Sequence, residues 1–88
     1  MIEKELKIVN KNGLHTRPAA NLVKLTSKYK SDVELSRNGF VINAKSIIGV
    51  MTLAAEYGCI LKLSVQGEDE EQAANDIEEL FAKGFGEI

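Results

Sequence analysis

The amino-acid sequence predicts an α+β fold in which helices pack on one face of a mostly antiparallel sheet. Two observations lead to this prediction: four short stretches alternate apolar and polar residues, and three stretches space their apolar residues for one helical face. Their order along the chain is strand, helix, strand, strand, helix, strand, helix. The 88 residues are enough for one compact domain and too few for two.

The strands are predicted from the alternation. Residues 2–9 form the first strand, and residues 32–37 the second. Asn38-Gly39 then predicts a type I′ hairpin turn into a third strand. A fourth strand begins near Cys59. The apolar residues that alternate are Ile2, Leu6, Ile8, Val33, Leu35, Phe40, Ile42, Cys59, Leu61, Leu63 and Val65.

Helical spacing predicts the other three elements. The first helix covers residues 16–29. The second can be capped by Ser46 and ended by Gly58. The third begins with Asp69 and Gln72, a pair that resembles a capping box, and stops at Gly84. The predicted apolar faces are Ala19, Leu22, Val23 and Thr26, then Ile47, Val50, Met51 and Ala54, then Ala73, Ile77, Leu80 and Phe81.

Composition narrows the class of protein. Hydrophobic residues make up 44% of the chain and charged residues 27%, which is typical of a globular protein rather than a disordered one. The single cysteine, Cys59, excludes an internal disulfide and a multi-cysteine metal site. The sequence shows no signal peptide and no apolar run of membrane-spanning length. We therefore expect a cytoplasmic protein that does not act on a membrane.

Charge is unevenly distributed around a net value of −2. Residues 1–62 hold ten basic and five acidic side chains, whereas residues 63–88 hold one basic and eight acidic. The acidic end is either a solvated helix face or a means of steering partners. Nucleic-acid binding is disfavoured, because the chain is net acidic and only 6% aromatic.

His15 is the only histidine, and it lies at the predicted start of the first helix. The backbone N–H groups of Thr16 and Arg17 would be unpaired there, which together with the helix dipole makes an anion site. Pro18 suits a first helical turn, and the Arg17 guanidinium suits phosphate oxygens. A neutral histidine in this place is a nucleophile for a covalent anion. The alternative is an ordinary cap or solvated side chain.

Two segments resemble the histidine-containing phosphocarrier (HPr) family of the phosphoenolpyruvate-dependent sugar phosphotransferase system. Gly13-Leu14-His15-Thr16-Arg17-Pro18-Ala19 is similar to its active-site motif. Asn43-Ala44-Lys45-Ser46-Ile47-Ile48-Gly49-Val50-Met51 is similar to its regulatory serine segment. The resemblance covers the whole chain, including its length and the order of elements.

The resemblance implies a single HPr-like domain over residues 1–88, folded as an open-faced β-sandwich with a four-stranded antiparallel sheet and three helices on one face. It implies a phosphoryl carrier rather than an enzyme, without a cofactor or metal. His15 would accept the phosphoryl group from phospho-enzyme I through Nδ1 and pass it to enzyme IIA domains. Arg17 would stabilise the phosphoryl oxygens.

Ser46 has two interpretations. On local sequence it is a helix cap; the resemblance implies phosphorylation by an ATP-dependent HPr kinase/phosphorylase. Ile47 and Ile48 cannot both face one core, so we expect at least one exposed side chain that, with Met51, can dock partners; the alternative is that all three are core or incidental. Nearby lysines either steer acidic partners or are ordinary solvated charge: Lys24, Lys28 and Lys45.

Two functions therefore remain in view. The first is a phosphocarrier in sugar uptake, supported by His15 with Arg17. The second is a mainly regulatory interaction protein that acts through a phosphate on Ser46 and binds a transcriptional regulator or an enzyme.

Overall fold

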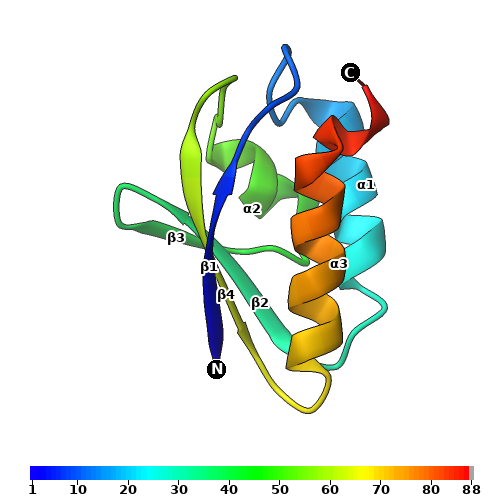
Figure 1. The fold of residues 1–88 in the computed structure, drawn as a ribbon. Helices are drawn as coiled ribbons and strands as arrows, with labels where there is room; N and C mark the ends of the chain where they lie inside the picture. The colour runs from blue at the N-terminus through cyan, green and yellow to red at the C-terminus, as the bar shows by residue number, and fades with distance from the viewer. Residues whose placement is uncertain (88) are drawn as a thin grey trace.

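The computed structural model describes residues 1–87 and confirms the predicted order of elements. The strands are β1 (Ile2–Lys7), β2 (Asp32–Arg37), β3 (Phe40–Asn43) and β4 (Ile60–Gln66), and the helices are α1 (Thr16–Thr26), α2 (Ile47–Thr52) and α3 (Glu70–Ala82), followed by a 3₁₀ turn at Gly84–Gly86. The strands form one antiparallel sheet in the order β1-β4-β2-β3. All three helices cover the same face of this sheet (Figure 1).

The core lies between the sheet and the helices. Alternation predicts it well, because one parity of each strand faces the helices. The ring of Phe81 on α3 packs edge to face against that of Phe85 in the 3₁₀ turn. Phe40 departs from the pattern: it lies on the edge strand β3 and is 56% exposed. The buried apolar residues of the sheet and helices are Leu6, Val33, Leu35, Ile42, Leu61, Leu63, Val65, Ala19, Leu22, Val50, Ala73, Ala74, Ile77 and Phe81.

The hairpin turn is confirmed. Asn38 and Gly39 both have positive φ, 51° and 86°, as a type I′ turn requires. β1 is shorter than predicted and ends at Lys7, although Ile8 still donates its N–H to the Cys59 carbonyl oxygen at 2.9 Å.

α2 is much shorter than predicted, ending at Thr52 rather than near Gly58. The chain leaves the helix because Ala54 takes a left-handed conformation (φ 48°). The Arg37 guanidinium stabilises this early end by donating to the carbonyl oxygens of Leu53 at 3.0 Å and Ala54 at 2.7 Å. Arg37 is 16 residues from Leu53 in the sequence, so local spacing could not reveal the contact.

α1 also stops early, at Thr26 instead of Tyr29. Lys28 and Tyr29 donate to carbonyl groups three residues back, so the helix tightens into turns before β2. The Thr26 hydroxyl donates to the carbonyl oxygen of Ala44 at 2.8 Å, and the end of α1 is thereby joined to the segment before α2.

The capping box predicted for α3 is wrong. Asp69 is the N-cap residue, but its carboxylate makes no cap hydrogen bond. It accepts instead from the backbone N–H groups of Lys30 at 2.9 Å and Ser31 at 3.0 Å, and from the Ser31 hydroxyl. Gln72 donates to Asp76 at 3.1 Å. Asp69 therefore fastens the α1–β2 connection to the start of α3.

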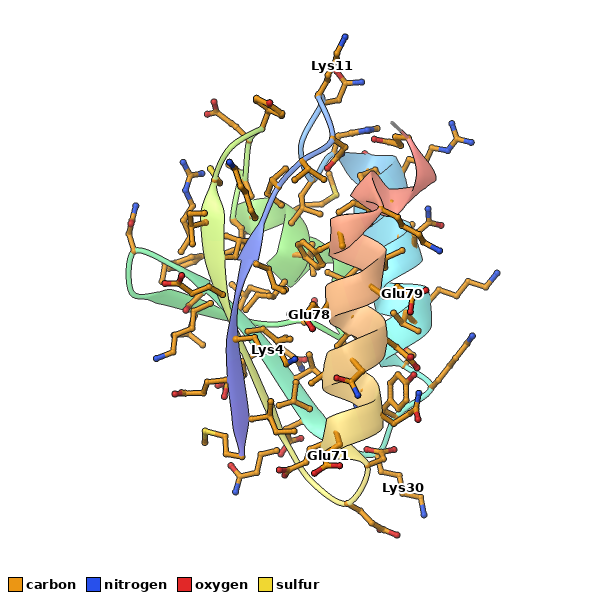
Figure 2. The ribbon with its side chains drawn as sticks, in the orientation of Figure 1. Lys4, Lys11, Lys30, Glu71, Glu78 and Glu79 are labelled. Carbon is orange, nitrogen blue, oxygen red and sulfur yellow. The ribbon has the colours of Figure 1, made fainter. Side chains whose placement is uncertain are left out.

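The helices α1 and α3 run antiparallel (Figure 1). The 3₁₀ turn that follows α3 therefore lies beside the start of α1. On the sheet side, Lys4 of β1 reaches Glu78 of α3 with an Nζ–Oε1 distance of 2.9 Å (Figure 2). Among residues 1–87, no helix is both long and apolar enough to cross a membrane.

Candidate functional site

His15 lies at the start of α1, as predicted, and is its N-cap residue. Its backbone is extended (φ −76°, ψ −173°), and its side chain makes no cap hydrogen bond. The first helical bond is donated by the Ala19 N–H to the His15 carbonyl oxygen at 3.0 Å. Within residues 1–87, the N–H groups of Thr16 and Arg17 have no acceptor. This helix start therefore keeps free donors beside the histidine.

The loop before His15 is held against the segment that follows α2. Leu14 donates its N–H to the Ala55 carbonyl oxygen at 2.9 Å, and the Leu14 side chain is buried. Gly13 has φ 67°, and a Cβ at this position would lie 2.4 Å from the Ala55 oxygen. Only glycine fits, because both the backbone conformation and the close approach exclude a side chain.

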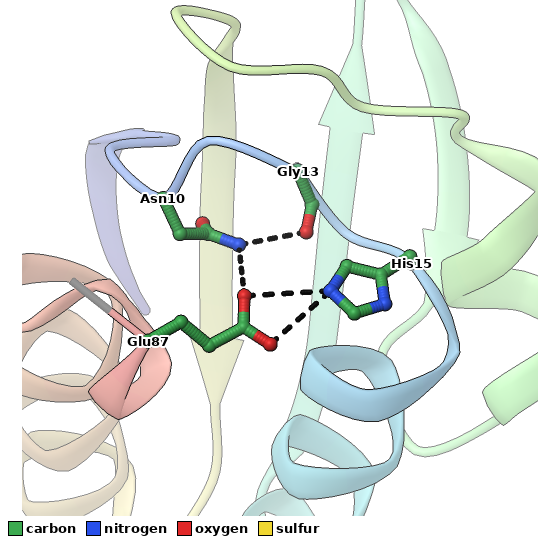
Figure 3. A network of polar contacts seen from close by, with 4 residues as sticks. All are labelled: Asn10, Gly13, His15 and Glu87. Carbon is green, nitrogen blue, oxygen red and sulfur yellow. Dashed lines mark hydrogen bonds and ion pairs between the residues drawn. The ribbon is translucent and has the colours of Figure 1, made fainter.

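Glu87 and Asn10 complete the surroundings of His15 (Figure 3). The Nε2 atom of His15 lies 3.1 Å from Oε2 and 3.4 Å from Oε1 of Glu87. The Asn10 amide donates to Glu87 Oε1 at 2.9 Å and to the Gly13 carbonyl oxygen at 2.8 Å. The His15 side chain is 40% exposed, so one edge of the ring is held and another is open to solvent.

The charge of Glu87 is favoured by its neighbours. The hydrogen bond from Asn10 lowers the pKa of the Glu87 carboxyl, and His15 and the positive charge of Arg17 act in the same direction. Glu87 therefore remains an anion at neutral pH and can only accept hydrogen bonds.

Arg17 lines an open hollow together with Glu87 of this network. Lys11, Asn12 and Asn21 also line the hollow. Arg17 takes part in none of the ion pairs formed among residues 1–87. The structure thus places Arg17 near Glu87 and leaves its guanidinium free to bind an anion.

Ser46 is the N-cap residue of α2, and its hydroxyl oxygen accepts from the Gly49 N–H at 3.1 Å. Lys45, the preceding residue, donates from Nζ to the Tyr29 carbonyl oxygen at 2.7 Å, just beyond the end of α1. His15, by contrast, is at the beginning of α1. The 11 residues of α1 span roughly 16 Å, so the structure does not bring Ser46 and His15 into contact.

At least one exposed side chain was expected at α2 and is found, but the apolar face predicted for this helix is wrong except at Val50, since Ile47, Met51 and Ala54 are exposed. Ile47 is 37% exposed, Ile48 75% and Met51 42%, while Val50 alone in α2 is buried. These three apolar side chains, here called the α2 patch, lie on the helix whose C-terminal connection holds the His15 loop. Lys24 and Lys28 are exposed, and Lys45 is partly buried.

Sequence reasoning missed Glu87 and Asn10. Glu87 lies 72 residues from His15 and reaches it only because α3 returns to the start of α1. The sole sequence signal was the turn of Lys11-Asn12-Gly13, which placed Asn10 next to the motif without assigning it a role. Within residues 1–87, no group of three or more histidine, cysteine, aspartate or glutamate side chains could hold a metal ion.

Comparisons with known proteins agree on one family. The family model described as "PTS HPr component phosphorylation site" matches residues 2–83. The phosphocarrier protein HPr of Xylella fastidiosa (strain Temecula1) is 47% identical over 87 residues, which cover 99% of this chain and 98% of that protein. That of Cupriavidus necator is 44% identical with the same coverage. The crystal structure of HPr-C-His from Thermoanaerobacter tengcongensis is 42% identical, with a TM-score of 0.97 over 100% of this chain and 99% of that one.

Proposed function

The chain belongs to the HPr family, the non-catalytic phosphoryl carriers of the phosphotransferase system, and from this premise we propose that His15 is the residue that bears the phosphoryl group. The observation that carries the proposal is the start of α1: a half-exposed histidine at an uncapped helix N-terminus with two free N–H groups. Phosphate oxygens are favoured at such a place.

Arg17 completes the proposed site. Phosphoryl transfer depends mainly on positioning and charge stabilisation, and a guanidinium supplies paired donors for two oxygens at once. The helix end adds about 0.3–1 kcal/mol at an exposed site. Such modest stabilisation orients the phosphoryl group without holding it too tightly for onward transfer.

We further propose enzyme I as the donor and enzyme IIA domains as acceptors. Both would approach the open edge of His15 and rest on the α2 patch. Its Ile48 side chain is 75% exposed, so docking would bury apolar surface that is otherwise in water.

Incubation with enzyme I and phosphoenolpyruvate tests the assignment. We expect one phosphate per chain, labile in acid and stable in base, as a nitrogen–phosphorus bond requires. His15→Ala should take up none while keeping the circular dichroism of the wild type. Arg17→Lys keeps the charge but loses the planar guanidinium, so transfer should be slower. Phosphate uptake by His15→Ala would show that the assignment is wrong.

A second proposed role is regulation through Ser46. It is supported by the position of Ser46 directly before the α2 patch and away from His15. A phosphate there adds a charge of about −1.5 to −2 beside the docking surface. Phosphorylation by an HPr kinase/phosphorylase would then weaken docking of enzyme I and, by changing the same surface, allow binding of a transcriptional regulator.

Two variants separate the physical causes. If charge dominates, Ser46→Asp should slow phosphorylation of His15, and added salt should reduce the difference by screening. If lost apolar contact dominates, salt should matter little and Ile48→Ala should reproduce the effect. Equal rates for the wild type, Ser46→Asp and the Ser46-phosphorylated chain would leave Ser46 as a helix cap alone.

A further inference from the structure

The two ring nitrogens of His15 have different surroundings. Nε2 lies 3.1 Å from the Glu87 carboxylate, whereas Nδ1 faces away from it (Figure 3). A carboxylate can only accept a hydrogen bond, so Nε2 must be the atom that carries the proton when the ring is neutral. The lone pair is then on Nδ1.

The orientation of the Glu87 carboxylate is itself held by Asn10. The Asn10 side chain is fully buried and donates to two acceptors, Gly13 O and Glu87 Oε1. Turning the amide round would place its oxygen against both acceptors, so only one orientation is possible. In that orientation the Asn10 Oδ1 atom is buried without a partner among residues 1–87. Burying the unpaired Oδ1 atom costs free energy, and the two hydrogen bonds that Asn10 donates to Gly13 and Glu87 offset this cost.

We propose that Glu87, held by Asn10, is a positioning residue that keeps the proton on Nε2 of His15 and so presents the Nδ1 lone pair to the incoming phosphoryl group. This inference rests on the proposed function of His15. The role differs from that of Arg17, because Glu87 acts through the histidine and not on the phosphoryl oxygens.

The same contact serves both directions of transfer. As the Nδ1–phosphorus bond forms, the bond between phosphorus and the donor atom breaks and its electron pair stays on the donor. No proton moves, since Nε2 keeps its hydrogen throughout. The phosphorylated ring is then cationic, and the Glu87 carboxylate stabilises its Nε2–H. When the phosphoryl group leaves, the bonding pair returns to Nδ1 and the neutral ring is restored.

Substitution of Glu87 by glutamine gives a sharp test, because Asn10 dictates how the new amide must lie. The Asn10 N–H requires an oxygen at the Oε1 position, so the glutamine NH₂ group takes the Oε2 position facing Nε2. An NH₂ group there donates to Nε2, and the ring proton must move to Nδ1. Glu87→Gln should therefore reverse the tautomer, whereas Glu87→Ala only releases it.

¹⁵N NMR at about pH 9, where an ordinary histidine is neutral, shows which ring nitrogen of His15 carries the proton. We expect the Nε2–H form in the wild type and the Nδ1–H form in Glu87→Gln. Phosphorylation by enzyme I and phosphoenolpyruvate should be about fivefold to tenfold slower in Glu87→Gln, the factor of one hydrogen bond, and less affected in Glu87→Ala. A histidine held in the wrong tautomer loses its reactive lone pair.

Glu71→Gln is the matched control. Like Glu87→Gln, it removes one negative charge, but from the first turn of α3. Glu71 lies at the opposite end of the molecule from Lys11, which lines the hollow beside His15 (Figure 2). It should leave both the ring and the rate unchanged. Wild-type ring signals in Glu87→Gln would overturn the inference, as would equal slowing of Glu87→Gln and Glu87→Ala. A wild-type chain that takes up no phosphate would instead defeat the proposed function, while the ring signals decide the role of Glu87 on their own.

Discussion

The helices α1 and α2 carry the two motifs, and they begin in different ways. At α2, the Ser46 hydroxyl accepts from the Gly49 N–H of the first turn. At α1, His15 occupies the same N-cap position, but its ring turns to Glu87 and leaves the N–H groups of the first turn free. One N-cap side chain binds its own helix, and the other binds Glu87 from the far end of the chain. A helix start without a cap hydrogen bond is less stable, so α1 forgoes local stability at the place where we propose that the phosphoryl group is held.

The largest effect is expected where the His15 loop contacts the segment after α2. Gly13→Ala places a Cβ 2.4 Å from the Ala55 carbonyl oxygen and requires an alanine at φ 67°. The left-handed conformation costs about 1–2 kcal/mol, and the overlap adds to it, so the free energy of unfolding should fall by more than about 2 kcal/mol. Urea denaturation measures the change.

Gly39→Ala is the control for conformation alone. Gly39 has φ 86°, but a Cβ at this position would have no atom within 4 Å. Its loss should be limited to about 1–2 kcal/mol. If the two substitutions cost the same, the contact between Gly13 and Ala55 does not hold the His15 loop.

A third helix start sharpens the comparison. Asp69 is the N-cap of α3, yet its carboxylate binds Lys30 and Ser31 across the fold. The hydrogen bond from the Ser31 hydroxyl and those from the backbone lower the pKa of Asp69 to about 2. A lowered folded-state pKa means that its stabilisation is present above the unfolded value of about 3.9 and is lost as the pH falls toward 2. Asp69→Asn should therefore lower Tm at pH 7, and the gap to the wild type should narrow between pH 4 and 2.

Glu71→Gln is the control for the loss of one negative charge at the start of α3. It removes one acidic charge from the first turn of α3 without touching the Ser31 contacts. A constant gap between Asp69→Asn and the wild type from pH 7 to pH 2 would contradict the assignment of this pH dependence to Asp69.

The capped start of α2 should show a moderate effect. Ser46→Ala removes the acceptor of the Gly49 N–H, and loss of such a cap costs about 1 kcal/mol. Ser27→Ala, at an exposed serine just after α1, should change the free energy of unfolding by less than about 0.5 kcal/mol. Equal effects of the two substitutions, measured by thermal unfolding, would show that the Ser46 hydroxyl does not cap α2.

The sequence predicts what local patterns determine. The alternation in β4 and the Asn38-Gly39 turn depend on neighbouring residues, and both were found as predicted. The N-cap position of His15 was likewise predictable, because Pro18 and the following apolar spacing mark a helix start. The motif resemblance singled out His15, Arg17 and Ser46 as site residues.

The features that sequence reasoning missed depend on contacts between distant segments. Arg37 stabilises the end of α2 by donating to the carbonyl groups of Leu53 and Ala54. The Asp69 carboxylate accepts from Ser31 instead of capping α3. Glu87 meets His15 only after the whole sheet and helical layer have formed. In each case the polar partner is chosen by tertiary proximity, which neither periodicity nor capping preference encodes.

The smallest effect concerns His15 itself and tests the comparison most directly. An asparagine at position 15 could cap α1, because its side-chain oxygen can accept from the free Arg17 N–H; Pro18 offers no N–H. Loss of the exposed contact with Glu87 costs little. His15→Asn should therefore be as stable as the wild type or more stable by about 0.5 kcal/mol, while taking up no phosphate. Thermal unfolding measures the stability, and incubation with enzyme I and phosphoenolpyruvate measures the uptake. A variant less stable than the wild type by about 1 kcal/mol would mean that the histidine already supports the start of α1, as the Ser46 hydroxyl supports the start of α2.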